Sequence, residues 1–128
     1  MLGSPKANFG ARRRSRLALD GKQFVPDIVE FLKPGESSVN GELMKQRAKE
    51  LNAHLGQYHA EYLLEHQELI PKEWQGKYYL VFLGTVWQDR DGDRFVPYLS
   101  WDGDGWYLSF DWLRGDWDSS VRLVRLRE

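Results

Sequence analysis

The feature that most constrains this chain is a two-residue alternation of apolar side chains on either side of a glycine- and aspartate-rich turn, residues 102–105. Such residues tolerate positive φ and are typical of a hairpin turn. If Trp101 faces Trp106 across this turn, one face of the ribbon is entirely apolar and consists of Phe95, Pro97, Leu99, Trp101, Trp106, Leu108, Phe110 and Trp112. The other face is more polar and consists of Val96, Tyr98, Ser100, Tyr107, Ser109 and Asp111. A slip of one residue would exchange the two faces, so this register is predicted, with the apolar face toward the core.

Three further segments have the composition of strands. Residues 78–83 are apolar on both faces, residues 84–88 extend them, and residues 121–126 alternate as a last strand. Asp91-Gly92 predicts a type I′ hairpin in which Trp87 faces Val96 and Thr85 faces Tyr98. Pro97 cannot donate a backbone hydrogen bond, so we expect its strand to be an edge strand or to be bulged there.

The N-terminal half is predicted to be helical. Pro26 suits the first position of a short helix over residues 26–33, whose apolar residues recur every four positions. Asn40 suits the N-cap of a helical region over residues 41–68. Gly56, in its middle, would cost about 1 kcal/mol relative to alanine in a continuous helix. Two helices joined near Gly56 are therefore favoured over one long helix, and Pro71 is expected to end the second.

Together these elements predict an α+β fold. N-terminal helices in residues 24–70 would pack on one face of a C-terminal three- to four-stranded antiparallel β-meander in residues 77–127. A parallel sheet is not expected, because strands and helices do not alternate along the chain. The 128 residues suit a single domain, predicted over residues 21–128, with residues 1–20 as a flexible basic arm.

Composition excludes several classes of protein. The chain contains no cysteine, which rules out disulfides and thiolate metal sites. It has no apolar run near the roughly 18 residues of a membrane span, and no signal-peptide pattern. We therefore expect a cytoplasmic protein without membrane attachment.

No catalytic, cofactor or metal motif is present. The 3 histidines, His54, His59 and His66, lack the i, i+3 or i+4 spacing of helical metal ligands. Asp89, Asp91 and Asp93 alternate, but a calcium loop needs glycine after the third acid, and here Arg94 follows it. A pair of catalytic carboxylates among Asp102, Asp104 and Asp111 is conceivable, although no spacing in the sequence brings them together.

The binding candidates are aromatic and basic. Of the 6 tryptophans, Trp101, Trp106 and Trp112 fall on the predicted core face, and Trp87 and Trp117 are the better candidates for exposure and for binding. Trp87, Tyr98 and Tyr107 would form an aromatic strip on the outer face of the sheet, where it could contact a partner. The basic arm offers phosphate contacts through Arg12, Arg13, Arg14 and Arg16.

Three functions are consistent with these residues. The leading hypothesis is a small non-enzymatic interaction module that binds a protein partner through the aromatic strip. The alternative is a nucleic-acid-binding protein that uses the arginine cluster together with aromatic stacking. A weaker alternative is a carbohydrate-directed protein that uses tryptophan and aspartate side chains. The sequence does not determine the oligomeric state.

Overall fold

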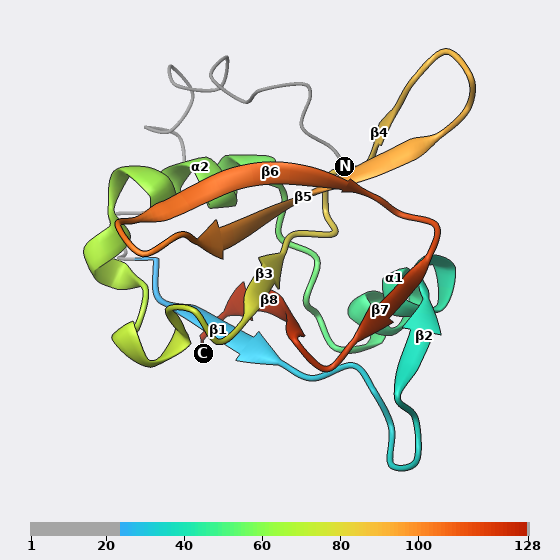
Figure 1. The fold of residues 1–128 in the computed structure, drawn as a ribbon, viewed down its shortest axis with the longest axis horizontal. Coiled ribbons are helices and arrows are strands. Elements are labelled where there is room, and N and C mark those ends of the chain that lie inside the picture. The colour runs from blue at the N-terminus through green and yellow to red at the C-terminus, as the bar shows by residue number, and fades with distance from the viewer. Residues whose placement is uncertain (1–23, 128) are drawn as a thin grey trace.

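A computed structural model describes residues 24–127. It contains a mixed six-stranded sheet, a two-stranded sheet and two α-helices (Figure 1). The long hairpin of β5 (Arg94–Trp101) and β6 (Trp106–Trp112) has the predicted register, in which Trp101 pairs with Trp106 and Phe95 with Trp112. The alternation of apolar residues therefore fixed this pairing correctly.

Strand β5 is paired along both edges. On one edge lies β6, and on the other lie β3 (Tyr79–Val81) and the two-residue β4 (Trp87–Gln88). Next to β3 lies β8 (Val121–Leu126), and beyond it β1 (Pro26–Val29). Strands β2 (Ser38–Asn40) and β7 (Asp116–Asp118) form the separate pair.

The prediction of an antiparallel meander with N-terminal helices is wrong. Strands β3 and β8 are parallel neighbours, so the larger sheet is mixed, and the helices lie in the middle of the chain, after two strands. A parallel pair does not require a helical crossover: here the connection from β3 to β8 passes through β4, β5, β6 and β7. The absence of strand–helix alternation therefore does not exclude parallel strands.

The predicted helix over residues 26–33 is also wrong, because this segment contains β1. Its apolar residues Ile28 and Leu32, together with Phe24 just before it, are spaced four positions apart. A spacing of four fits one face of a helix and equally one face of a strand, since four is a multiple of two. Pairing with β8 decides the outcome, and Pro26 is tolerated because β1 is an edge strand.

The helical region is divided in two, as favoured from the sequence. Helix α1 (Gly41–Glu50) begins at Asn40, whose side chain accepts a hydrogen bond from the Leu43 N–H, and α2 (Gln57–Glu65) begins after Gly56. Helix α2 ends at Glu65, before Pro71, and is followed by the 3₁₀ helices η2 (Gln67–Leu69) and η3 (Lys72–Trp74). Within residues 24–127, neither helix has the length and apolar character needed to cross a membrane.

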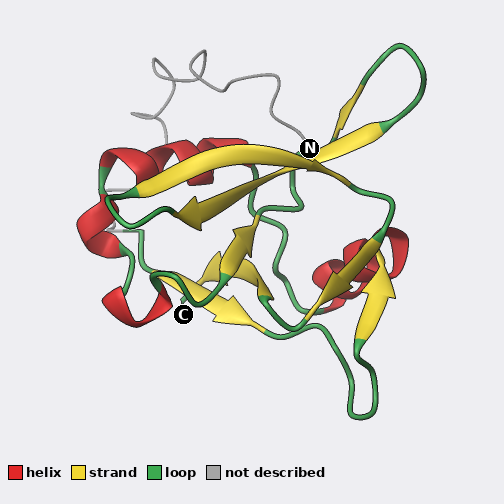
Figure 2. Ribbon diagram, in the orientation of Figure 1, coloured by secondary structure: helices red, strands yellow, loops and turns green. Residues whose placement is uncertain are grey.

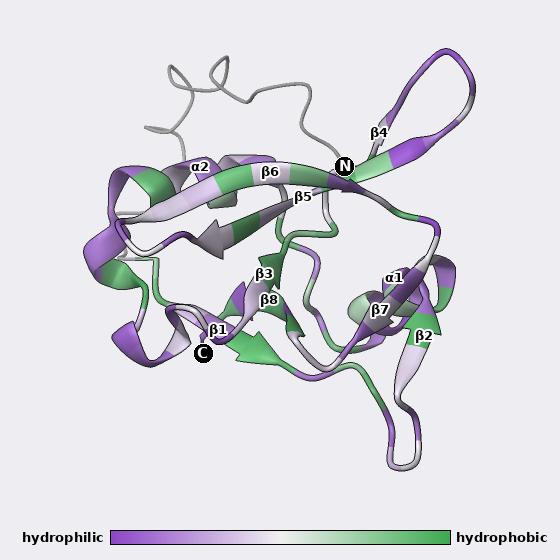
Figure 3. Ribbon diagram, viewed as in Figure 1, coloured by the Kyte–Doolittle hydropathy of each residue, from purple (hydrophilic) through white to green (hydrophobic). Residues whose placement is uncertain are grey.

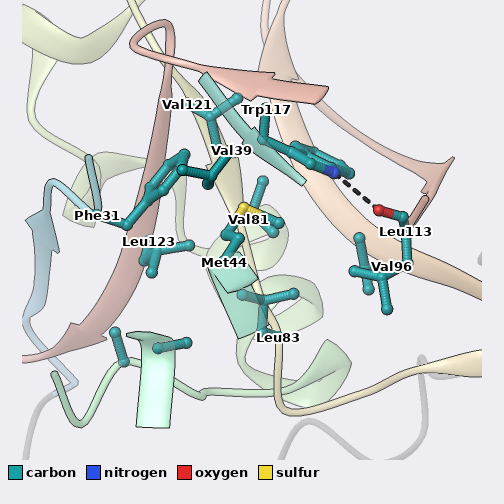
Figure 4. Packing of buried hydrophobic residues seen from close by; sticks show 12 residues of the cluster. Phe31, Val39, Met44, Val81, Leu83, Val96, Leu113, Trp117, Val121 and Leu123 are labelled. Carbon is teal, nitrogen blue, oxygen red and sulfur yellow. Dashed lines mark hydrogen bonds between the residues drawn. The ribbon is translucent and has the colours of Figure 1, made fainter. Parts of the chain in front are cut away.

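The sheet is buried on both faces, with a separate core on each. Helix α2 lies on the face that carries Leu80, Leu99 and Trp106. Helix α1 and the β2–β7 pair cover part of the opposite face; Figure 2 shows α1 and α2 on different sides of the molecule. Figure 4 shows this second core, in which residues of β3, β5 and β8 meet Met44, Val39 and Trp117. The face predicted to be outward is therefore covered in part: Val96 is buried, whereas Tyr98 is partly buried and Tyr107 is exposed.

The first hairpin differs from its prediction by one residue. Trp87 pairs with Phe95 instead of Val96, because the loop has three residues and Gly92 follows a type I turn with φ of 86°. The expectation for Pro97 is wrong: β5 is not an edge strand, and its register with β6 continues through Pro97 without a bulge. The missing donor coincides instead with the interruption between β3 and β4 on the other edge of β5. The Pro97 carbonyl accepts a hydrogen bond from Phe82, and its nitrogen, which has no hydrogen, points to the same edge. The hairpin projects from the body, with hydrophilic residues at its tip (Figure 3).

A buried arginine attaches the loop before β2 to α1. Arg47 donates hydrogen bonds to the Phe31 carbonyl at 2.8 Å and to both carboxylate oxygens of Glu36, at 2.6 and 2.9 Å. These bonds lower the pKa of Glu36 from 4.5 to about 2. The charged carboxylate is thus favoured in the folded state.

The folded protein should lose stability as the pH falls from 4.5 toward 2, in part through Glu36. A carboxyl group with a lowered folded pKa stabilises the fold above its unfolded pKa, and this contribution disappears on protonation. Glu36→Gln should therefore be less stable than the wild type at pH 7, with the difference narrowing at acid pH. Thermal unfolding of both proteins, with Glu73→Gln as an exposed control, measures this. A difference in thermal stability between wild type and Glu36→Gln that stays constant from pH 7 to pH 2 would contradict the lowered pKa of Glu36.

Gly41→Ala should destabilise the protein by about 1–3 kcal/mol, because a Cβ at this position would lie 1.7 Å from the Leu113 carbonyl oxygen. The start of α1 would have to move away from the end of β6. Urea unfolding checks this, with the exposed Gln46→Ala on the same helix expected to change stability by less than about 0.5 kcal/mol. Equal effects of the two substitutions would show that this close approach is unimportant.

Candidate functional site

A hollow of about 280 Å³ lies where the second core ends. Its lining comes from β3, β5, β6, β7 and the start of β8, and consists of Tyr79, Tyr98, Asp111, Asp116, Trp117, Asp118, Ser120 and Val121. It is the part of the sheet face that α1 and the β2–β7 pair leave uncovered.

Strand alternation brings the aromatic residues into this hollow. Tyr98 pairs with Ser109 and lies opposite Val81, so its ring shares a face with Tyr79, two residues before Val81. The two tyrosine rings have centroids 5.9 Å apart and an interplanar angle of 78°, so they form a corner. Tyr79 is 48% exposed, which leaves its ring accessible to a ligand.

Trp117 closes the inner part of the hollow. It is only 7% exposed and packs in the second core opposite Val39. Its indole N–H donates to the Leu113 carbonyl at 2.9 Å, the dashed line in Figure 4. Trp117 therefore supports the site as a fixed structural element and offers little surface to a partner.

A second hollow, of about 480 Å³, continues the first. The two share Asp111, Asp116 and Trp117, and the second adds Trp112, Arg114 and Gly115. They form a continuous depression along the β6–β7 corner, which we call the β7 groove.

The β7 groove is acidic. Within residues 24–127, no salt bridge neutralises Asp111, Asp116 or Asp118. Asp118 accepts hydrogen bonds from the N–H and hydroxyl of Ser120, at 2.9 and 2.6 Å, and Asp111 accepts one from the Trp112 N–H. These contacts orient the two side chains and leave their negative charge without a counter-charge.

The pKa directions agree with a negatively charged groove. Hydrogen bonds from the side chain and backbone of Ser120 lower the pKa of Asp118, so this carboxylate is charged at neutral pH. Burial and, after it, the charge of Asp111 raise the pKa of Tyr98, so its hydroxyl keeps its proton. Neutral aromatic rings next to unpaired carboxylates are suited to a positively charged ligand.

The structure separates the residues of the predicted aromatic strip. Because of the shifted register, Trp87 lies on the α2 face, where it is 41% exposed and its indole N–H donates to the Gln57 side chain at 2.7 Å. Tyr107 is 55% exposed and shares a face with Tyr98, but it does not line the groove. Tyr98 and Trp117 are brought together, although Trp117 is buried where the sequence suggested exposure. Arg12, Arg13, Arg14 and Arg16 lie outside the described residues.

Sequence reasoning missed Tyr79, Asp116 and Asp118 as groove residues. Tyr79 starts a strand that is otherwise buried on both faces, and nothing in its neighbourhood in the sequence distinguishes it. The two aspartates flank Trp117 in a three-residue strand. In a strand, the sequence aspartate–tryptophan–aspartate indicates that the tryptophan points inward and the two aspartates point outward. This pattern could have predicted that Asp116 and Asp118 lie at the surface beside a buried Trp117.

The titratable residues noted in the sequence have local contacts of their own within residues 24–127. The His59 ring accepts a hydrogen bond from the Gly56 N–H, and the His66 ring stacks on Tyr62 with centroids 4.2 Å apart. Asp89, Asp91 and Asp93 have carboxylate oxygens within 4.8 Å of one another. One oxygen of Asp89, however, accepts the N–H groups of the other two, which is an ordinary turn contact.

Comparison with protein-family models, with curated proteins and with solved structures gave no match.

Trp117→Ala should destabilise the protein by about 3–5 kcal/mol, because it removes a buried ring and the hydrogen bond to Leu113. Trp87→Ala should cost about 1–2 kcal/mol, since much of that ring is already in contact with water. Urea unfolding followed by circular dichroism ranks the two substitutions. A larger loss of stability for Trp87→Ala than for Trp117→Ala would contradict the structural role assigned to Trp117.

Proposed function

We propose that this protein is a small interaction module that binds a segment of a protein partner in the β7 groove. The observation that carries the proposal is the groove itself, in which Tyr79 and Tyr98 form an aromatic corner beside unpaired carboxylates. Partner-binding surfaces are enriched in tyrosine and tryptophan, because these rings offer a large contact area at a small cost in conformational entropy.

The shape of the groove suits a peptide segment. Its first hollow, of about 280 Å³, accommodates one long side chain. Its continuation along the β6–β7 corner provides room for neighbouring residues of the same segment. The groove is set in a rigid surround, because Trp117 and Val121 at its base belong to the second core.

Nucleic-acid binding, the alternative from the sequence, finds no support in the groove. Phosphates would be repelled by Asp111, Asp116 and Asp118, so this alternative rests on the arginine cluster alone. Carbohydrate binding could use the same aromatic rings, but no observation favours it over a protein segment.

Partner capture should depend on Tyr79 and be independent of Tyr107. Immobilised wild-type protein and the variants Tyr79→Ser and Tyr107→Ser are incubated with an extract of the source cells, and bound proteins are quantified by mass spectrometry. Both tyrosines are exposed on the same sheet face, and only Tyr79 lines the groove, so the pair is a matched control. A partner retained by wild type and Tyr107→Ser, but lost with Tyr79→Ser, is expected. Equal capture by all three proteins would refute the proposal.

A further inference from the structure

We infer that the β7 groove recognises an arginine side chain, so that the partner segment is basic. This inference rests on the proposed function and specifies the chemistry of its ligand. It follows from the arrangement of aromatic faces and negative charge in one hollow.

The aromatic corner supplies faces on which a planar cation can stack. A guanidinium within about 6 Å of a ring centroid is attracted to the face of tyrosine or tryptophan. The chain already uses this contact twice: Arg122 lies 4.3 Å from the ring centroid of Tyr78, and Arg114 lies 4.8 Å from that of Trp112. Within residues 24–127, no lysine or arginine lies over Tyr79 or Tyr98. Tyr79 is 48% exposed and Tyr98, which packs on the second core, lines the same hollow.

The carboxylates supply the acceptors. Asp116 and Asp118 flank the buried Trp117, so their side chains leave β7 on its outward side, and Asp111 reaches the same hollow from β6. A guanidinium has five N–H donors in a rigid plane and can bridge carboxylates while it stacks. Asp116 and Asp118 are exposed and Asp111 is partly buried, so a guanidinium can reach all three carboxylates and form charge-assisted bonds with them.

Other ligands fit this arrangement less well. An anion would meet three carboxylates and, among the described residues that line the groove, one cation, Arg114, which lies over Trp112 and pairs with Asp93. A neutral apolar side chain would leave the carboxylates unpaired. Lysine carries the required charge but lacks the planar group, so it should bind more weakly than arginine.

The inference is tested with labelled peptides and the full-length chain. Fluorescence anisotropy measures binding of a peptide with an Arg-Arg-Arg core flanked by glycine and serine. The same peptide with lysine, or with neutral citrulline, serves for comparison. The protein carries Arg12→Gln, Arg13→Gln, Arg14→Gln and Arg16→Gln, so that the chain's own arginine cluster cannot compete. Two further variants in this background are Asp116→Asn/Asp118→Asn and the control Asp102→Asn/Asp104→Asn, which removes equal charge at the β5–β6 turn.

Saturable binding of the arginine peptide is expected, severalfold weaker with lysine and absent with citrulline. Asp116→Asn/Asp118→Asn should weaken it at least about tenfold, which corresponds to the loss of about 1.4 kcal/mol expected for one charge-assisted bond. Asparagine keeps the oxygen that accepts from Ser120, and circular dichroism checks that both variants fold. No binding of the arginine peptide, or an equal loss in the control variant, overturns the inference. Partner capture that depends on Tyr79 would remain, so the two failures are distinguishable.

Discussion

Two adjacent residues of β3, Leu80 and Val81, are both fully buried although their side chains point to opposite faces of the sheet. Each lies in a different core: Leu80 packs with the residues of α2, and Val81 with those of α1 and the β2–β7 pair. A strand buried on both faces requires a layer on each side, so this pair dictates that the two helices separate to opposite sides of the sheet. A meander with helices on one face would leave Val81 and its neighbours in water.

The β7 groove is a consequence of how this second layer ends. Helix α1 and the short β2–β7 pair cover Val81 and Val96 but stop before Tyr79, so a sheet face that is buried at one end becomes accessible at the other. The boundary is set by Trp117, which is held by its bond to the Leu113 carbonyl. That carbonyl also lies against Gly41 at the start of α1, so one backbone group joins helix, strand and groove. Any rearrangement of this corner would alter the core and the groove together.

Part of the site could be predicted from the sequence. Tyr98 was correctly placed on the face opposite Trp101, because a register with strict alternation assigns every residue of the hairpin. Trp87 was misplaced because one extra loop residue reverses the face of the preceding strand, and Asp91-Gly92 fits both loop lengths. Trp117 was misjudged because its three-residue strand is too short to show a period. Its burial depends on Val39, which is distant in the chain.

The sequence by itself determined the β5–β6 register, the N-cap of α1 at Asn40, and the presence of two helices, although α1 ends at Glu50, six residues before Gly56. Each of these follows from local chemistry: side-chain alternation, a capping side chain, and a glycine that disfavours a continuous helix. Only the tertiary structure decided that residues 26–29 form a strand, that β3 and β8 run parallel, and that Tyr79 meets Asp116 and Asp118. These outcomes depend on pairing between segments far apart in the chain, and the energy of such pairing is absent from the pattern of either segment alone.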